Sequence, residues 1–148
     1  MLKLFLDELG QDSSIASMKD RKRIQKAMYF GNLAVDLGYR YSWYLMGPYS
    51  TNLTRDYYDL SEALETDKID KSLNDNVKAK LAQIKPLLTP PRGVDGVDWL
   101  ETVASVHYLQ KVSRLSEADA RARFKQSKPQ LDQYYDAGVQ ALRKFKLI

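Results

Sequence analysis

The sequence predicts a mainly α-helical fold, a single domain of about seven helices with one small β element. Apolar residues recur at intervals of three and four over most of the chain, which is the period of helices with one buried face. Only residues 39–46 are aromatic-rich without that period. A chain of 148 residues, 44% of them hydrophobic, has the usual size of one domain and can bury a core. We therefore expect one helical domain over residues 1–148.

Two helices are predicted before the β element. Residues 2–9 place apolar side chains at helical spacing and end at Gly10, a suitable C-terminal breaker. The next helix is expected over residues 21–37, capped by Asp20. Its apolar residues form two stripes, so it should be central and contacted from several sides. Gly31 lies within it, which predicts a close crossing with another helix.

The β element is predicted at residues 39–46, where aromatic and aliphatic residues alternate with other side chains. Gly47-Pro48 then begins a turn that ends at Ser50. One strand cannot satisfy its own backbone hydrogen bonds. It must pair with another extended piece or with another chain, so a homo-oligomer is one arrangement that the sequence allows.

The rest of the chain predicts further helices. Ser50 or Thr51 caps a helix that continues to Leu64, and the charged residues 66–72 are expected to form a loop. A helix follows over residues 73–88, with Pro86 disturbing its last turn.

The breaker-rich stretch 89–96 is expected to be an inter-helix loop. Asp95 or Asp98 then caps another helix, Ser116 caps a short one, and the last helix is expected over residues 129–145.

Composition excludes several kinds of chemistry. The chain has no cysteine and one histidine, His107, so disulfides, thiolate metal sites and multi-histidine sites are excluded. His107 lies on an apolar helix side, where a packed, hydrogen-bonded residue is the favoured interpretation. No glycine-rich phosphate loop and no Ser–His–acid order is present. We therefore expect no enzyme and no cofactor.

Four acidic residues, at positions 56, 59, 62 and 65, are spaced three apart along one predicted helix. Such spacing can hold a hard cation, but a solvated helix face is the favoured interpretation, and we expect no metal. The N-terminus lacks the pattern of a signal peptide, and no window approaches the roughly 20 apolar residues that span a bilayer. We therefore expect a cytoplasmic protein without a membrane partner.

Basic charge is concentrated in two segments of a chain with a net charge of +4. Residues 121–148 carry seven basic and two acidic side chains. Residues 19–26 carry five basic side chains against Asp20 alone, and we predict that these five face an anion. They are Lys19, Arg21, Lys22, Arg23 and Lys26. Either an acidic protein or nucleic acid is a suitable partner, and ordinary solvated helix faces are the simpler alternative.

Aromatic residues are concentrated between positions 39 and 49. These rings either fill the core between helices or form an exposed groove or strand edge that receives a protein partner. The candidate partner-binding residues are Tyr41, Trp43, Tyr44 and Tyr49.

Residues 22–30, 37–39 and 41–50, followed by the helix from Leu53 to Leu60, resemble the YwgA-like group of small bacterial and archaeal proteins. That group combines a "K-x-x-Y" helix, an aromatic strand ending in Gly-Pro-Tyr-Ser and a following helix. Residues 104–109 are a weaker second similarity. More distantly, the arrangement resembles the Panacea, or SocA-like, domain. That resemblance implies small antitoxins and adaptors that bind a partner protein, without a cofactor.

Two functions remain open at this point. The first is a non-catalytic protein-binding module, antitoxin- or adaptor-like, in a prokaryotic defence or stress system. The alternative is a DNA-binding regulator with a winged-helix-like unit that uses the basic segments 19–26 and 121–146. The acidic residues after the Gly-Pro turn weigh against this alternative, because they would repel phosphates. An Asp/Glu-dependent hydrolase or nuclease is a third, less favoured hypothesis.

Overall fold

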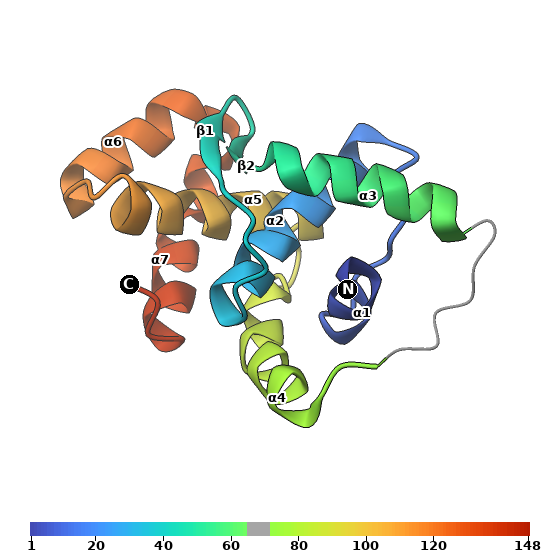
Figure 1. The fold of residues 1–148 in the computed structure, drawn as a ribbon. Coiled ribbons are helices and arrows are strands. Elements are labelled where there is room, and N and C mark those ends of the chain that lie inside the picture. The colour runs from blue at the N-terminus through green and yellow to red at the C-terminus, as the bar shows by residue number, and fades with distance from the viewer. Residues whose placement is uncertain (65–71) are drawn as a thin grey trace.

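The computed structural model describes residues 1–64 and 72–148. Within this part of the chain the fold is mainly helical with a small sheet, as the sequence predicts (Figure 1). The sheet consists of β1 (Ser42–Tyr44) and β2 (Gly47–Tyr49). The α-helices described are α1 (Leu2–Glu8), α2 (Met18–Ala34), α3 (Thr51–Leu64), α4 (Asp75–Ile84), α5 (Gly96–His107), α6 (Glu117–Ser127) and α7 (Tyr135–Lys144). Most of the loop predicted at 66–72 lies outside the described residues.

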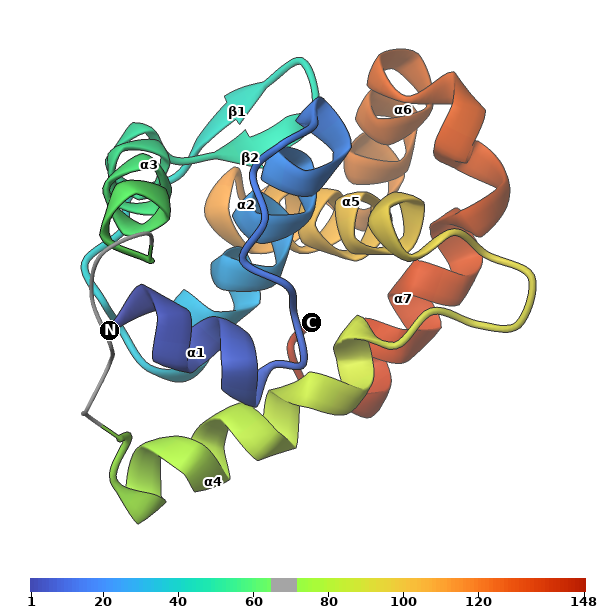
Figure 2. The same cartoon turned by 90° about the vertical axis from the view of Figure 1, so that its right-hand side faces the viewer.

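Helices α2 and α5 form the centre of the fold. They pack against each other, α1 and α4 contact α2, and α6 and α7 contact α5 (Figures 1 and 2). The predicted central position of the second helix is thus confirmed. At Gly31 a Cβ would lie 3.2 Å from Leu9 Cδ1, so the close approach predicted there is to the residue that ends α1.

Helix α2 does not have the predicted ends. It begins at Met18 and stops at Ala34, whereas we expected residues 21–37 with Asp20 as the cap. Ser17 is the cap: its Oγ accepts a hydrogen bond from the Asp20 amide, and the Asp20 carboxylate accepts one from the Ser17 amide. This reciprocal pair is a capping box, which satisfies two donors at the helix start.

The predicted strand is shorter than residues 39–46, and the prediction of a turn at 47–50 is wrong. Ser42, Trp43 and Tyr44 pair antiparallel with Tyr49, Pro48 and Gly47, respectively. Leu45 and Met46 form the two-residue loop of this hairpin. The strand therefore finds its partner in the next few residues of its own chain, which removes the strand-pairing reason to expect a homo-oligomer.

Three further segments adjoin the α-helices. Pro86 lies in a 3₁₀ segment, η1 (Lys85–Leu88), which ends α4 as the sequence predicts. The predicted helix 129–145 is not continuous, because its first part is a 3₁₀ segment, η3 (Pro129–Tyr134). A π-helical turn, η2 (Tyr108–Val112), continues α5. Residues 89–95 connect η1 to α5, as expected of the predicted loop.

The core is one cluster of buried apolar side chains to which all seven described α-helices contribute. Residues at its centre include Phe5, Ile24, Leu53, Leu100 and Phe124. None of the helices in the described ranges is long and apolar enough to cross a membrane.

Candidate functional site

The hairpin lies over α2 and α5 at one end of the molecule (Figures 1 and 2). Gln25 of α2 fixes the residue that follows β2, Ser50. The Gln25 side-chain oxygen accepts a hydrogen bond from the Ser50 amide, and its side-chain nitrogen donates one to the Ser50 carbonyl, both at 2.9 Å. Ser50 Oγ accepts from the Leu53 amide, which confirms the predicted cap region of α3. The hairpin is thereby fixed between α2 and α3, and its two-residue loop projects outward.

The four candidate aromatic residues have different surroundings. The Tyr41 ring packs edge-on against Tyr29 at 5.1 Å, and its hydroxyl is buried without a hydrogen-bond partner among the described residues. Burial raises the pKa of Tyr41 well above 10. The polar end of Tyr41 therefore faces the protein interior, and its role in partner binding stays a prediction.

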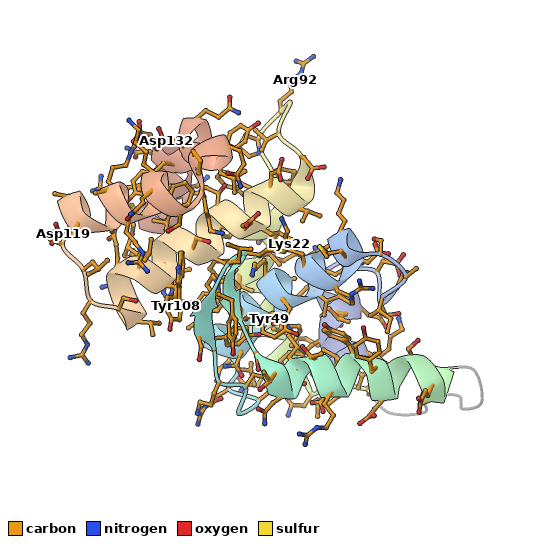
Figure 3. The ribbon with its side chains drawn as sticks, turned by 90° about the horizontal axis from the view of Figure 1, so that it is seen from above. Lys22, Tyr49, Arg92, Tyr108, Asp119 and Asp132 are labelled. Atoms are coloured by element: carbon orange, nitrogen blue, oxygen red, sulfur yellow. The ribbon has the colours of Figure 1, made fainter. Side chains whose placement is uncertain are left out.

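The other three aromatic residues reach the surface to different degrees. Trp43 is half-buried, with its ring centroid 5.7 Å from that of Tyr108. Tyr49 is also half-buried, whereas Tyr44 remains 48% exposed and contacts the Tyr49 ring edge. Figure 3 looks down on this end of the molecule and shows Tyr49 and Tyr108 on either side of the hairpin. The aromatic segment is thus partly packed against the core and partly exposed.

Beneath the hairpin, two buried lysines and a buried carboxylate form a cluster with the partly exposed Lys22 at its edge. Glu101 of α5 accepts hydrogen bonds of 2.8 Å from Lys22 and from Lys128. Lys26 Nζ lies nearby and donates to the Pro48 carbonyl at 2.6 Å. Lys26 and Lys128 are each only 1% exposed. The cluster therefore contains three ammonium groups and a single carboxylate.

Burial and the excess of positive charge both affect the pKa values of the cluster residues. Burial lowers the pKa of Lys26 to about 7, and the charges of Lys128 and Lys22 act in the same direction. Burial also lowers the pKa of Lys128, although Glu101 opposes the shift. For Glu101, burial acts to raise the pKa, but hydrogen bonds from Lys128 and Lys22 outweigh it and keep the carboxyl ionised.

The five side chains predicted to face an anion do not form one free basic surface. Lys26 is buried beneath the hairpin, so it does not lie on an open basic surface. Lys19 is exposed but pairs with Asp95 at 2.8 Å, and Lys22 pairs with Glu101. Arg23 donates to the Asp12 carbonyl and lies 3.7 Å from Asp20. Arg21 donates to the Ile15 carbonyl.

Three of the seven basic side chains in the C-terminal segment form ion pairs. Arg121 contacts Asp136 at 2.7 Å and Asp132 at 3.4 Å. Arg143 pairs with Glu117 at 2.8 Å, and Lys128 belongs to the buried cluster. These contacts reduce the positive charge that this segment presents to solvent.

His107 is packed inside the protein, as the sequence suggests. It is 5% exposed, and a 2.7 Å hydrogen bond joins its Nδ1 to the Tyr29 hydroxyl. Burial lowers the pKa of His107 to about 4, with a smaller contribution from the charge of Lys111. The imidazole is therefore neutral near pH 7.

Two cavities adjoin at the base of the hairpin loop, and Met18, Lys22 and Met46 line both. The first, of about 540 Å³, also has Lys19, Asp95 and Asp98 in its wall. The second, of about 190 Å³, is lined in addition by Arg21, Gln25, Lys26, Tyr49 and Tyr57. The first cavity contains charges of both signs, whereas the second contains only positive ones.

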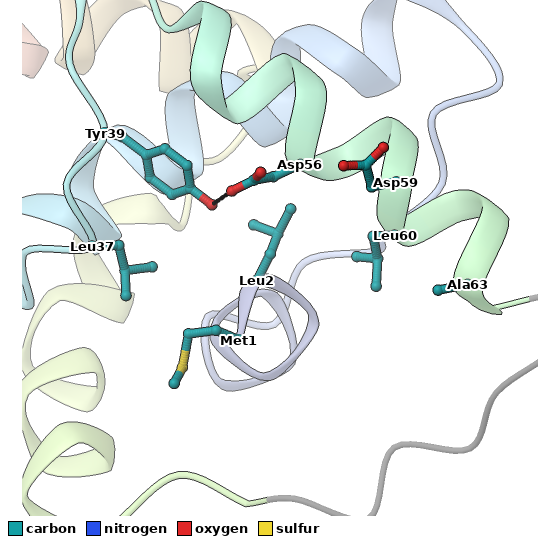
Figure 4. Close-up of a pocket in the computed structure, with 8 residues that line it drawn as sticks. All are labelled: Met1, Leu2, Leu37, Tyr39, Asp56, Asp59, Leu60 and Ala63. Carbon is teal, nitrogen blue, oxygen red and sulfur yellow. Dashed lines mark hydrogen bonds between the residues drawn. The ribbon is translucent and has the colours of Figure 1, made fainter.

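A third cavity, of about 420 Å³, lies where α1 meets α3 (Figure 4). Tyr39 donates a 2.7 Å hydrogen bond to Asp56 across its wall, and Asp59 lies farther along α3. Burial, followed by the hydrogen bond to Asp56, raises the pKa of Tyr39 above its usual value. Of the four acidic positions considered for a cation, Glu65 lies outside the described residues. No cluster of three or more potential metal-ligating His, Asp or Glu side chains occurs among those described.

Several residues of this region were not identified from the sequence. The sequence does point to Glu101, because this charged residue stands in a largely apolar part of its helix. The sequence also points to Leu45 and Met46, because two apolar residues in a hairpin loop leave apolar surface exposed, and such surface often marks a binding site. The sequence does not point to Lys128, which stands in a polar stretch typical of solvent-exposed chain.

Comparisons of the chain with protein-family models, with curated proteins and with solved structures gave no match.

Proposed function

We propose that this protein is a non-catalytic protein-binding module of the antitoxin or adaptor type, acting in the cytoplasm of a prokaryotic defence or stress system. The observation that carries the proposal is the exposed apolar surface at the hairpin loop. Leu45 is 89% exposed, Met18 60% and Tyr44 48%. We call Met18, Tyr44, Leu45 and Met46 the hairpin-tip surface.

The hairpin-tip surface has the composition of a binding site. Tyr and Met are enriched at protein interfaces, because they provide a large contact area and Met adapts to irregular partners. Here the side chains are presented by a hairpin whose base is fixed by Gln25 and by the buried cluster. A rigid support lowers the entropy that binding costs.

The rim of this surface favours an acidic partner. Lys19 and Lys22 border the cavities at Met18 and Met46, and Lys19 remains mostly exposed despite its ion pair. An apolar centre with a charged rim is typical of protein interfaces, in which the rim charges chiefly accelerate association. We expect a partner with apolar side chains surrounded by Asp and Glu.

The ion pairs support a protein partner over DNA. In residues 19–26, Lys19 and Lys22 pair with carboxylates and Lys26 is buried, and in the C-terminal segment Arg121, Lys128 and Arg143 pair with carboxylates. These contacts reduce the number of exposed, unpaired cations that could release counterions from a DNA backbone, which is a large source of DNA affinity.

Site-specific photocrosslinking in cells tests the proposal. A photoreactive residue at position 45 should form an adduct with a specific protein. The same residue at position 112 is the matched control, because Val112 is an exposed apolar residue of η2, outside the hairpin-tip surface. Absence of an adduct at position 45, or the same adduct at both positions, would contradict the proposal.

A further inference from the structure

The smaller cavity at the base of the hairpin has only positive charge in its wall. Arg21, Lys22 and Lys26 line it, together with Tyr49 and Tyr57, and no acidic side chain does. Helix α2 supplies all three cations: Lys22 and Lys26 are four residues apart on one helix face, and Arg21 lines the cavity beside them. Figure 3 shows Lys22 on this face of α2 and Tyr49 at the end of β2.

Two of these cations have no carboxylate within ion-pair distance among the described residues. One guanidinium nitrogen of Arg21 donates a hydrogen bond to the Ile15 carbonyl, and the Lys26 ammonium donates one to the Pro48 carbonyl. The third, Lys22, shares Glu101 with Lys128. Each Lys ammonium has three donors and a guanidinium has five, so donors remain for a further acceptor.

Burying a cation without a counter-charge costs free energy unless an anion compensates it. Lys26 is 1% exposed, and burial lowers its pKa to about 7, which reflects this cost. The neighbouring cavity differs in that Asp95 and Asp98 balance Lys19 and Lys22. Of these two cavities, the smaller one combines a buried lysine with a wall that has no acidic side chain.

We propose that this cavity binds a phosphate monoester group, with Lys26 and Arg21 as its principal ligands and Lys22 at its rim. A phosphate monoester carries a charge of about −1.5 to −2 near pH 7 and three acceptor oxygens, which suits two unpaired cations. The guanidinium of Arg21 offers the planar fork that binds phosphate through two hydrogen bonds. Met18, Met46 and the two tyrosine rings contact the organic part of the ester. This site shares Met18, Met46 and Lys22 with the proposed protein-binding surface, but phosphate binding does not depend on that function.

Calorimetric titration at low salt with phenyl phosphate tests the site. Saturable binding should weaken at least tenfold in Lys26→Met, which keeps the aliphatic stem, and in Arg21→Gln. Lys19→Gln is the matched control, because Lys19 lies on the same helix but outside this cavity, and its affinity should stay within twofold of wild type. Acetate should bind far more weakly than phenyl phosphate, since it carries a single charge.

The source of the phosphate group is distinguished by two further ligands. Inorganic phosphate and a phosphoserine pentapeptide are titrated beside phenyl phosphate. Tighter binding of the peptide than of phenyl phosphate assigns the group to a phosphorylated protein, and the reverse order assigns it to a small metabolite.

Amide chemical shifts in the complex show whether the ligand occupies this cavity. Perturbations should centre on residues 18–26 and on Met46 and Tyr49. Because Arg21 is partly exposed, Arg21→Gln is the safer variant if Lys26→Met fails to fold. The absence of saturable binding to wild type, equal affinity in Arg21→Gln, or shifts centred elsewhere would overturn the proposal.

Discussion

Single residues under the hairpin set the stability of this end of the molecule. Among the described residues, Glu101 is the one carboxylate that pairs with Lys22 and Lys128, and its charge also favours the ionised form of Lys26. Removing one member of a buried ion pair is costly, because the remaining charges stay buried without compensation.

Glu101→Gln is therefore expected to lower the free energy of unfolding by about 3–5 kcal/mol. Asp95→Asn is the matched control: it removes the exposed pair with Lys19 but keeps an oxygen to cap α5, and we expect about 1 kcal/mol or less. Urea denaturation of both variants at pH 7 measures the difference. Equal losses would show that the cluster does not stabilise the fold as described.

His107 is predicted to make stability depend on pH. Its pKa is about 4 in the folded protein and 6.5 as the ordinary value, so the unfolded chain binds the proton more readily between these values. The stability contributed by neutral His107 is complete above pH 6.5 and is lost as pH falls towards 4. Between pH 6.5 and 5 the loss should be about 1.5 kcal/mol.

The measurement is urea denaturation of wild type and His107→Gln at pH 6.5, 6.0, 5.5 and 5.0. This range lies above the titration of the carboxylates, whose ordinary pKa values are near 4. The wild-type free energy should fall over the range, and that of the variant should fall much less. Parallel curves for the two proteins would contradict the assignment.

Gly47 occupies a position that no other residue suits. Its φ is +89°, and a Cβ there would lie 2.5 Å from Ser105 Oγ. Gly38 has a similar φ of +83°, but a Cβ there would have no neighbouring atom within 4 Å. A substitution at Gly38 therefore measures the cost of the backbone conformation without a steric clash. Gly38→Ala is expected to cost about 1 kcal/mol. Gly47→Ala is expected to cost about 1–3 kcal/mol more, because overpacking is added.

The clash itself is tested by Ser105→Ala in the Gly47→Ala background. Ser105 Oγ has no hydrogen-bond partner among the described residues, so its removal sacrifices little. Thermal or urea unfolding should show that the second change recovers most of the additional loss. No recovery would place the cost of Gly47→Ala elsewhere.

At the scale of elements, the hairpin acts as a cover over the buried cluster. The ring of Trp43 in β1 packs on Tyr108, and Lys128 Nζ lies 5.5 Å from the indole centroid. Because Trp43 is half-buried, Trp43→Ala should cost about 2 kcal/mol, less than a fully buried aromatic residue. Trp43→Phe keeps the packing and should cost less than half of that in the same urea experiment. A loss below about 0.5 kcal/mol in Trp43→Ala would show that the hairpin is not held by this ring.

The sequence predicts the helices better than the hairpin for a physical reason. Helical periodicity repeats over many residues, so Leu53, Tyr57 and Leu60 indicate α3 clearly. The hairpin has three residues in each strand and lacks glycine in its two-residue loop. Pro48 lies within β2, where it also argues against a strand. The positive φ at Gly47, which lets the chain reverse, is not visible in the sequence.

At the scale of the whole molecule, the arrangement of α2 and α5 determines which charges are buried. Lys26 is one helical turn from Lys22 and is indistinguishable from it in sequence, yet β2 covers one and leaves the other at the edge. Lys128 comes from a distant part of the chain and meets Glu101 only through tertiary packing. Burial of these two lysines follows from long-range contacts, so composition and periodicity do not predict it.

The central claim is that the molecule acts by binding a protein through the hairpin-tip surface. Leu45→Asp tests it most directly, because a side chain that is 89% exposed can change without disturbing the fold. The affinity of the purified crosslinked partner for wild type, Leu45→Asp and Val112→Asp should be measured by calorimetry. We predict at least a tenfold loss for Leu45→Asp and no more than a twofold change for Val112→Asp. Equal affinity of the partner for wild type and Leu45→Asp would contradict the claim.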